Sequence, residues 1–550
     1  MRKIVFILVT IGLGLQALGQ PAKSPKFYPD DPIKAVPPPL PAKSVKLRKL
    51  NDFYDYFLND FGKPGERWEE GKPGIPAQNT NTLGEVPDDD WYTNRHYFHP
   101  MTLEELRRGP DKVGPPTQGG KWRVVAAKTE GITPGFTILD ARGRRYIIKF
   151  DPLEYPEIAT APDMIGAKFF YALGYNVPEN YLISLRRENL VIGEDTMLTD
   201  EKGRKRKMTN EDVGEILLHV PVLEDGSYRA TASLYLPGSP VGPRRYHGTR
   251  RDDPNDIVPH EHRRDLRGLR VFCAWLGHDD SRAINSLDML DTGDGVPFVK
   301  HYLIDFGSLL GSGSDGPNSP RSGNVPLFSW SESAREFFTL GLYVPSWARA
   351  KYPTYSSVGR FEYERFDAAK WTPEYHNPAF ANLLPEDAFW AARQVLAFTD
   401  EQIRAIVKTG QFSDPRADAW VAECLIKRRD KVGRAFLNQA LPLDFFKTEN
   451  GRLTFVDLAA KHGLSENGPY TITWSEFDNA RSEAKEIPQA VGPQIPATQT
   501  GFLEATITGK DQERTVRVYL RERGGTHELV GVERSKQTPA KKQPAQWRMK

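Results

Sequence analysis

Cysteine is nearly absent from this chain, whose 550 residues include only Cys273 and Cys424. A fold built on a framework of disulfide bonds is therefore excluded. Each thiol lies in an apolar run typical of a helix, where an unpaired cysteine packs as a small hydrophobic side chain. We expect both thiols to be buried and free.

An excess of charge of one sign is also missing, because 74 lysines and arginines balance 72 aspartates and glutamates. This balance does not favour a polyanionic partner, so we expect no binding to nucleic acid. Beyond the N-terminus, the sequence has no apolar run of the roughly 20 residues needed to cross a bilayer. No transmembrane segment is expected there.

The N-terminus has the pattern of a secretion signal. Arg2 and Lys3 precede an apolar run over residues 4–18, and small residues at Ala17 and Gly19 suit cleavage before Gln20. The run is shorter than a membrane span, and no cysteine follows it that could carry a lipid. We predict a signal peptide over 1–19 and an exported protein, periplasmic or secreted.

The remaining sequence changes character several times, and a chain of this length exceeds one compact core. After the signal peptide we predict a proline-rich tether (20–48), an N-terminal extension (49–120), a strand-rich lobe (121–240), a helical lobe (241–446), a β-rich appendage (447–534) and a basic disordered tail (535–550). The predicted class is α+β, with two lobes and a small appendage.

Alternating and helical patterns place the main elements. Strands are expected over 122–127, 136–139, 146–150, 181–185, 228–236, 470–474, 502–508 and 515–520, and helices over 162–173, 263–276, 385–397, 399–409 and 415–439. Pro162 and Gly174 mark the two ends of the first of these helices.

Two acidic motifs carry the chemistry. Asp280 and Asn285 are five positions apart, and Asp305 ends the apolar run that precedes Phe306 and Gly307. Enzymes of the protein-kinase type use such elements: one Asp orients the attacking hydroxyl and accepts its proton, while an Asn and a second Asp bind metal. The spacing therefore indicates phosphoryl transfer.

The strand-rich lobe offers the other parts of such a site. Lys149 lies in a strand between apolar neighbours, as a phosphate-pairing lysine does. The preceding loop, residues 128–135, contains Gly131 and Gly135, which would allow backbone N–H groups to approach phosphates. The loop has no GxGxxG pattern, and by itself it is more typical of an ordinary hairpin.

Together these residues resemble the atypical kinase superfamily that includes HipA-like bacterial kinases, CotH-like spore-coat kinases and phosphoinositide kinases. The resemblance covers roughly residues 121–436. It implies a two-lobed kinase-like fold in which Asp280 is the catalytic base, Asn285 and Asp305 are metal ligands, and Lys149 pairs with the nucleotide phosphates. It also implies ATP and Mg²⁺ as cofactors.

The same resemblance assigns an acidic partner to the lysine. An acid eleven positions before the glycine that ends the αC helix has this role in the family, and Asp163 occupies that register where Glu is usual; Glu157 is the alternative. The longer spacing between Asn285 and Asp305 fits a hairpin of residues 286–290 and 298–303. Residues 311–323 correspond to the activation loop, and no Ala-Pro-Glu follows them.

Together with the predicted signal peptide, the resemblance implies an exported phosphotransferase. Its hydroxyl acceptor stays open between a protein, a sugar, a lipid headgroup and a small molecule. Transfer of AMP stays open, because the same carboxylates serve a nucleotide bound in reverse. One alternative is a catalytically inactive kinase-like scaffold, which the predicted export favours since ATP is scarce outside the cytoplasm. A metal-dependent hydrolase is the third, because His260, Glu261 and His262 precede a helix that His278 and Asp279 follow.

Overall fold

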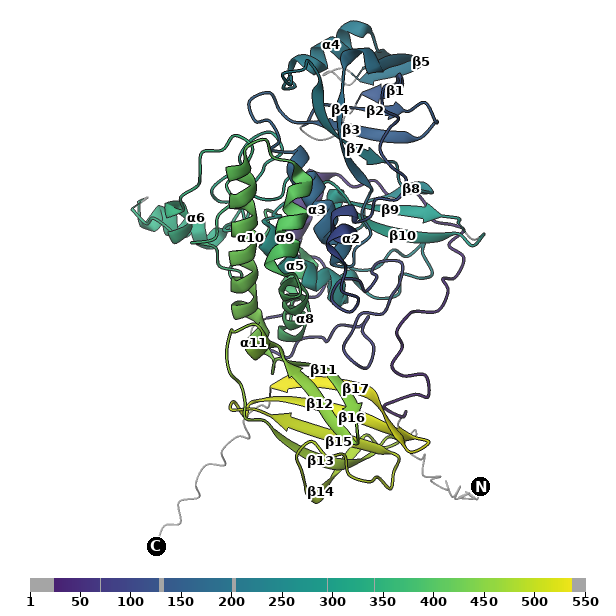
Figure 1. Cartoon of the computed structure of the whole chain (residues 1–550), viewed down its shortest axis with the longest axis vertical. Helices are drawn as coiled ribbons and strands as arrows, with labels where there is room; N and C mark the ends of the chain where they lie inside the picture. Colours follow the sequence, from purple (N-terminus) through teal and green to yellow (C-terminus); the bar gives the residue numbers. More distant parts are fainter. Residues whose placement is uncertain are drawn as a thin grey trace, which may run out of the picture.

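The computed structural model describes residues 24–69, 71–127, 133–199, 204–293, 295–340 and 342–536. The predicted signal peptide lies outside these ranges, as does the tail from residue 537 onward. Within them, no helix combines the length and apolarity required to cross a bilayer. The chain folds into a β-rich lobe, a helical lobe and a β-rich C-terminal body, stacked along the long axis of the molecule (Figure 1).

The β-rich lobe is one mixed sheet with the strand order β4-β7-β3-β2-β1-β5-β6. Its elements are β1 (Trp122–Ala127), β2 (Gly135–Leu139), β3 (Arg145–Phe150), α3 (Thr160–Ala172), β4 (Asn180–Leu185), β5 (Leu190–Thr199), β6 (Lys205–Lys207), α4 (Asn210–Leu218) and β7 (Tyr228–Leu234). One face packs into a core around Trp122, Phe136 and Tyr146. The helix α3 lies between this sheet and the helical lobe (Figure 1).

The helical lobe contains α5 (Arg264–Leu276), α7 (Pro378–Ala381), α8 (Pro385–Leu396), α9 (Asp400–Val407) and α10 (Pro415–Phe436). Beside them lies a small sheet of β8 (Ser239–Gly242), β9 (Ser286–Asp291) and β10 (Phe298–Leu303) in the order β10-β9-β8. One large apolar cluster joins α3, α5, α8 and α10, so α3 packs into the core of the helical lobe, and the sheet of the β-rich lobe has a core of its own.

The C-terminal body begins directly after α10. It consists of the hairpin β11 (Leu443–Glu449) and β12 (Arg452–Asp457), the helix α11 (Leu458–Lys461), and a sheet of β13 (Thr471–Asp478), β14 (Glu483–Val491), β15 (Phe502–Thr508), β16 (Arg514–Arg523) and β17 (Thr526–Lys536). The sheet order is β14-β13-β15-β16-β17. Ser535, where the tail was expected to start, is thus part of β17.

The N-terminal segment is bound along the body. Phe27 is buried against Phe477 and Tyr519 of the C-terminal sheet, and Ala42 is buried beside Val241. The segment continues into α1 (Asp52–Phe57) and, further on, α2 (Leu103–Arg108). Its proline-rich stretch therefore connects the C-terminal body with the small sheet of the helical lobe.

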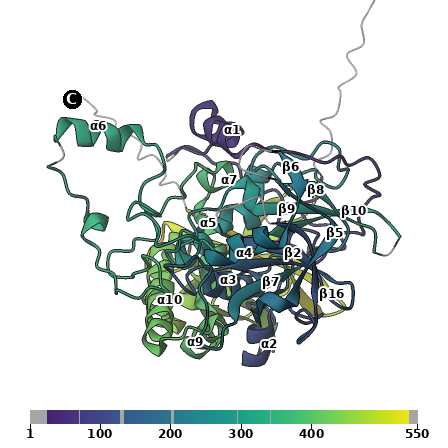
Figure 2. The same cartoon turned by 90° about the horizontal axis from the view of Figure 1, so that it is seen from above.

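Most predicted elements are confirmed, including the α+β class, the two lobes, the first three strands, the helix with Asp163 and the 286–303 hairpin. Both cysteines are free and buried, as expected. The segment after residue 323, for which no helix was predicted, carries α6 (Trp330–Phe338), which projects from the body (Figure 2). None of the residues of α6 is buried.

Candidate active site

Side chains along β3 point alternately to the two faces of the sheet, and this alternation sets the direction of Lys149. Tyr146, Ile148 and Phe150 are buried in the sheet core, so the intervening side chains face the other side, toward α3. There, Lys149 Nζ lies 2.8 Å from Asp305 Oδ1 and 3.7 Å from Asp163 Oδ2. The lysine predicted from the strand pattern therefore meets both acids that the resemblance assigned to its surroundings.

Asp163 lies in the first turn of α3 and is only 2% exposed. Its Oδ1 accepts a hydrogen bond from the backbone N–H of Phe306 at 3.1 Å, and its Oδ2 accepts one from the Thr231 hydroxyl at 3.2 Å. Thr231 is the cross-strand neighbour of Lys149. One carboxylate thus ties together the lysine, the sheet and the residue after Asp305.

Glu157, the alternative partner, has a different role. Its carboxylate accepts the backbone N–H of Ser413 at 3.0 Å and 3.1 Å from its two oxygens. It therefore fixes the segment before α10, while Asp163 lies beside the lysine.

Asp305 follows β10 in a left-handed backbone conformation, with φ of 63°. This conformation is energetically unfavourable for residues other than glycine, and strained residues of this kind are common at functional sites. The next residue, Phe306, is 1% exposed and stacks on Phe170 of α3 at a ring distance of 5.1 Å. The buried ring anchors the turn, while the Asp305 side chain is 44% exposed.

The loop after α5 holds the second acidic motif. The helix ends at Gly277, which has the left-handed φ of 68° that suits a C-terminal cap. The Asn285 side-chain amide donates to the carbonyl of Asp280 at 2.6 Å and to its Oδ2 at 2.9 Å. The spacing of five residues therefore closes a compact loop in which the two side chains touch.

This loop is joined to the segment with Asp305. The backbone N–H of Ile304 donates to the Asn285 carbonyl at 3.1 Å, and the Ser308 hydroxyl lies 3.5 Å from Asp280 Oδ2. His278 lies near both acids: burial lowers the pKa of His278, whereas Asp280 and Asp305 raise it. The two motifs thus form one site.

Arg282 belongs to this site, although the sequence did not single it out. Its guanidinium forms ion pairs with Asp280 and with Asp52 of α1, and it lies over the ring of Tyr375. Its position two residues after Asp280 was the only available signal. Arg282 holds the carboxylate of Asp280 in one orientation.

Asp279 points away from the site and is 4% exposed. It accepts hydrogen bonds from the Ser322 hydroxyl and from the Asn318 side chain, both in the segment that corresponds to the activation loop. Burial raises the pKa of Asp279 to about 7, even though Ser322 acts to lower it. This buried acid fastens the loop beside the site.

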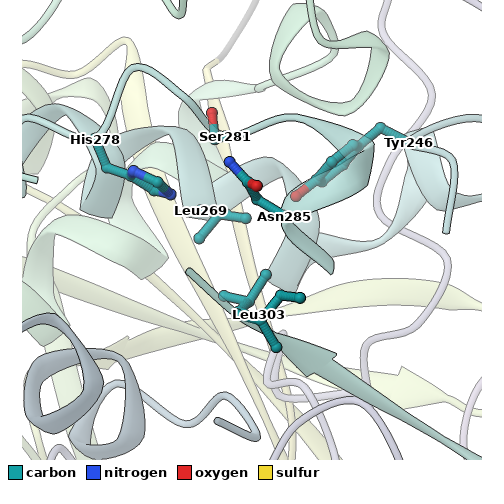
Figure 3. Close-up of a pocket in the computed structure, with 7 residues that line it drawn as sticks. Tyr246, Leu269, His278, Ser281, Asn285 and Leu303 are labelled. Carbon is teal, nitrogen blue, oxygen red and sulfur yellow. The ribbon is translucent and has the colours of Figure 1, made fainter. Parts of the chain in front are cut away.

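A small cavity of about 10 Å³ lies beneath the Asp280 loop. Figure 3 shows the Asn285 side chain between Ser281 and the hydroxyl end of Tyr246, with Leu269 and Leu303 below. The surface of this cavity is mostly apolar, and Asn285 is part of its lining beside Leu269 and Leu303. The backbone position of Asn285 therefore depends on the packing of α5 and β10.

The charge of the site is set by Lys149. Burial by itself lowers the pKa of Lys149, but Asp163 and Asp305 raise it by more, so the pKa lies above its ordinary value. The ammonium is fully charged at neutral pH. The ammonium lies between the carboxylates of Asp163 and Asp305, and a charged lysine with an acidic partner on the neighbouring helix is typical of phosphate-pairing lysines.

The residues fit a magnesium ion held together with a nucleotide. Mg²⁺ binds through one or two carboxylates plus substrate phosphates rather than through an all-protein cage. The side chain of Asp305 is exposed, and Asn285 is held next to Asp280. These oxygen ligands match the preference of a hard cation.

A cage of protein ligands, in contrast, is not found: the described residues contain no group of three or more His, Cys, Asp or Glu that could hold a metal. His260 binds the carbonyl of Arg245 and the carboxylate of Asp256, and His262 lies beside Arg267. His260 and His262, two of the metal ligands of the hydrolase alternative, therefore make structural contacts instead.

The predicted glycine loop is described only in part. Gly131 lies outside the described residues. Gly135 begins β2 and is the cross-strand neighbour of Lys149. The loop thus leads into the sheet directly beside the lysine.

Two basic residues that follow β8, in a sequence typical of a solvated loop, are buried in the helical lobe. Arg244 and Arg250 are 2% and 1% exposed, and both pair with the buried Asp288. Buried guanidinium groups need such partners because an unpaired buried charge is costly. They stabilise the small sheet of the helical lobe.

No family model and no curated protein matches the sequence. Among solved structures, the chain is similar to the Golgi casein kinase, with a TM-score of 0.29 and 10% identity, covering 75% of this chain and 96% of that one. A structure of the Golgi casein kinase with Mn/ADP bound has a TM-score of 0.29 and 10% identity, covering 74% and 94% of the two chains. Likenesses of this strength assign no function.

Proposed function

We propose that this protein is a kinase-like phosphotransferase that moves a phosphoryl group from ATP to a hydroxyl acceptor. The observation that carries the proposal is the contact of Lys149 Nζ with both Asp305 and Asp163. The Asp280–Asn285 loop is bonded to the segment carrying Asp305. Phosphoryl transfer depends mainly on positioning and electrostatic stabilisation, which this cluster supplies.

Each residue has a chemical role in this proposal. Lys149 pairs with phosphate oxygens, and Asp163 keeps its ammonium in place. Asp280 accepts the proton of the acceptor hydroxyl as the new O–P bond forms and the bond to ADP breaks, with the electron pair leaving on ADP. Asp305 and Asn285 would hold Mg²⁺, which neutralises charge on the phosphates when it is bound.

A non-catalytic nucleotide-binding module is the second candidate. The ion pair between Arg282 and Asp280 favours it, because the proposed catalytic carboxylate is already bound to a guanidinium group of the chain. Export, as predicted from residues 1–19, also favours a binding role. The acceptor class (protein, sugar or lipid) belongs to the first candidate alone.

Intact-mass measurement after incubation with ATP and Mg²⁺, together with analysis of the nucleotides released, separates these functions. The proposal predicts ADP and a gain of phosphate on the chain or on an added acceptor. A gain of AMP, or nucleotide binding without turnover, would overturn phosphoryl transfer and support the reversed nucleotide or the binding module.

Single substitutions test whether Asp280 and Asp305 take part in the proposed reaction. Asp280→Asn and Asp305→Asn should each lower ADP formation by about 10²–10³-fold, the loss typical of one electrostatic group in a site. Asp315→Asn is the matched control, because Asp315 is exposed in the neighbouring loop and should leave turnover unchanged.

A further inference from the structure

A hollow of about 280 Å³ lies at the connection between the two lobes. Its walls come from five places: the segment before α2 with Arg95, the segment after α2, the end of α3 with the loop to β4, the end of β7 with its connection to β8, and β10. None of the residues assigned to the active site lines it.

Hydrogen bonds hold these walls together. The backbone N–H of Leu303 donates to the Asn176 carbonyl at 2.9 Å, and the Asn176 side-chain amide donates to the His301 carbonyl at 3.1 Å. Leu234 N–H donates to the Glu179 carbonyl at 2.9 Å. The loop after α3 is therefore bonded to the sheet of one lobe and to β10 of the other.

Three cations line this hollow: Arg95, Lys112 and Lys300. Within the described part of the chain, no carboxylate forms an ion pair with any of the three. Arg95 donates instead to the carbonyls of Tyr171 and Tyr175, at 2.9 Å and 3.0 Å. Like charges around one cavity repel each other, which destabilises the compact state, and a cavity lined by one sign of charge attracts ions of the opposite sign.

Glu179 is the one carboxylate in the lining, and its charge is already used. One of its oxygens, Oε2, accepts the backbone N–H groups of Lys112 and Val113, each at 2.8 Å, and the Tyr181 hydroxyl. These bonds direct it toward the backbone after α2. It shapes the wall and leaves the cationic side chains of the hollow unpaired.

The pKa of Lys300 is lowered from its ordinary value, mainly by burial. Burial is the largest cause that lowers it, and Arg95 and Lys112 lower it further, while Asp291 and Asp90 raise it. The two acids are not within ion-pair distance of Lys300. Together these effects disfavour the charged form of Lys300. An anion bound beside Lys300 would favour the charged form instead.

The remaining lining is aromatic. Tyr171, Tyr235 and Tyr302 contribute rings to the hollow, and Lys300 Nζ lies 5.8 Å from the ring centroid of Tyr302. Rings of this kind pack against flat or apolar groups and offer hydroxyls to polar ones. A few polar groups in a concave and partly aromatic cavity are the usual composition of a small-molecule site.

We propose that this hollow binds a small polyanion, of the phosphate- or diphosphate-ester class, whose flat or apolar part packs on the tyrosines. Arg95, Lys112 and Lys300 bind the anionic group. Because its walls belong to both lobes, the ligand links them at their connection. The proposal does not depend on phosphoryl transfer.

Inorganic pyrophosphate is the probe, and calorimetry of the full chain gives its affinity. The double variant Lys112→Met/Lys300→Met should weaken the binding assigned to this hollow by at least tenfold. Lys370→Met is the matched control, since Lys370 is exposed and remote in sequence from the hollow. Unchanged affinity in the double variant, or no binding to the wild type, would overturn the proposal.

Lysine acetylation read by peptide mass spectrometry places the ligand independently of the active site. Pyrophosphate should protect Lys300 and Lys112 from the reagent and leave Lys370 reactive. The double variant should unfold at an equal or higher urea concentration, because it relieves repulsion. Lower stability with unprotected lysines would mean that the cations are structural, and would reject the site.

Discussion

At the scale of single residues, the pair of Lys149 and Asp163 has both a structural and a chemical role. The Asp163 side chain is 3% exposed and that of Lys149 is 16% exposed. Removing one partner of a buried pair leaves an uncompensated charge, which typically costs about 3–5 kcal/mol. Loss of activity in a lysine variant could therefore come from unfolding alone.

A double variant separates the two roles. Lys149→Met should lower the free energy of unfolding by about 3 kcal/mol and ADP formation by about 10²–10³-fold. Adding Asp163→Asn removes the unpaired charge, so urea unfolding should recover while ADP formation stays low. Recovery of ADP formation with stability would show that Lys149 has no chemical role. Arg145→Ala, on the same strand but exposed, is the control and should retain activity.

Asp279 makes stability depend on pH. Its pKa is about 7 in the fold and about 4 in an unfolded chain. Between these values the native state holds the extra proton, so the contribution is present at pH 4 and is lost as pH rises to 7. The loss is at most of order 3–4 kcal/mol.

Asp279→Asn lacks this titration. Urea unfolding at pH 5 and pH 8 should show a smaller fall in the free energy of unfolding for the variant than for the wild type. Asp280 and Glu374 face Asp279 and raise its pKa, so both must be intact in the comparison. Equal falls in the two proteins would contradict the assignment.

At the scale of elements, the helix α3 fixes the position of Phe306, the residue after Asp305. A Cβ added at Gly166 would lie 2.7 Å from Phe306 Cβ, so no other residue fits without movement there. The same helix carries Asp163, which binds the Phe306 backbone. The glycine thus lets the helix and the turn with Asp305 approach closely.

Gly166→Ala should lower ADP formation by about tenfold or more, because the displaced Phe306 moves the turn with Asp305. Its thermal stability should change little, because a gain of up to about 1 kcal/mol in helix propensity offsets the crowding. Gly214→Ala in α4 is the matched control. A Cβ there meets nothing within 4 Å, so it should stabilise the chain and leave activity intact. Equal activity in both variants would reject the coupling.

At the scale of the whole molecule, the C-terminal body is fused to the helical lobe by a buried ionic cluster. Asp444 of β11 pairs with Arg393 of α8 and with Arg534 of β17, and it accepts the Tyr97 hydroxyl at 2.7 Å. Arg393 also pairs with Glu85. Segments from the N-terminal extension, the helical lobe and the appendage therefore meet at one carboxylate.

Asp444→Ala should destabilise the chain by about 3–5 kcal/mol, because two buried guanidinium groups lose their shared partner. Urea unfolding with a probe in each part of the molecule gives the measurement. Lys447→Ala breaks an exposed pair with Glu449 on the same strand and should cost less than about 1 kcal/mol. Similar losses in the two variants would mean that the cluster contributes little.

The sequence alone determined the main strands and helices that surround the candidate site, and the order in which its proposed residues occur along the chain. Period-two and helical patterns are local properties, so they placed β3 around Lys149, α3 around Asp163 and the hairpin before Asp305. The spacing of Asp280 and Asn285 is local too, and the structure brings those two side chains into contact.

Only the tertiary structure decided which charges meet. Asp163 rather than Glu157 approaches the lysine because the register of α3 against the sheet is set by packing around Phe306 and Gly166. Arg282 pairs with Asp280 and also with Asp52 of α1, which lies more than 200 residues earlier in the chain. Arg244 and Arg250 are buried because Asp288 lies between them. The unpaired cations at the lobe connection likewise come from segments distant in sequence, which only the packed fold places around one hollow.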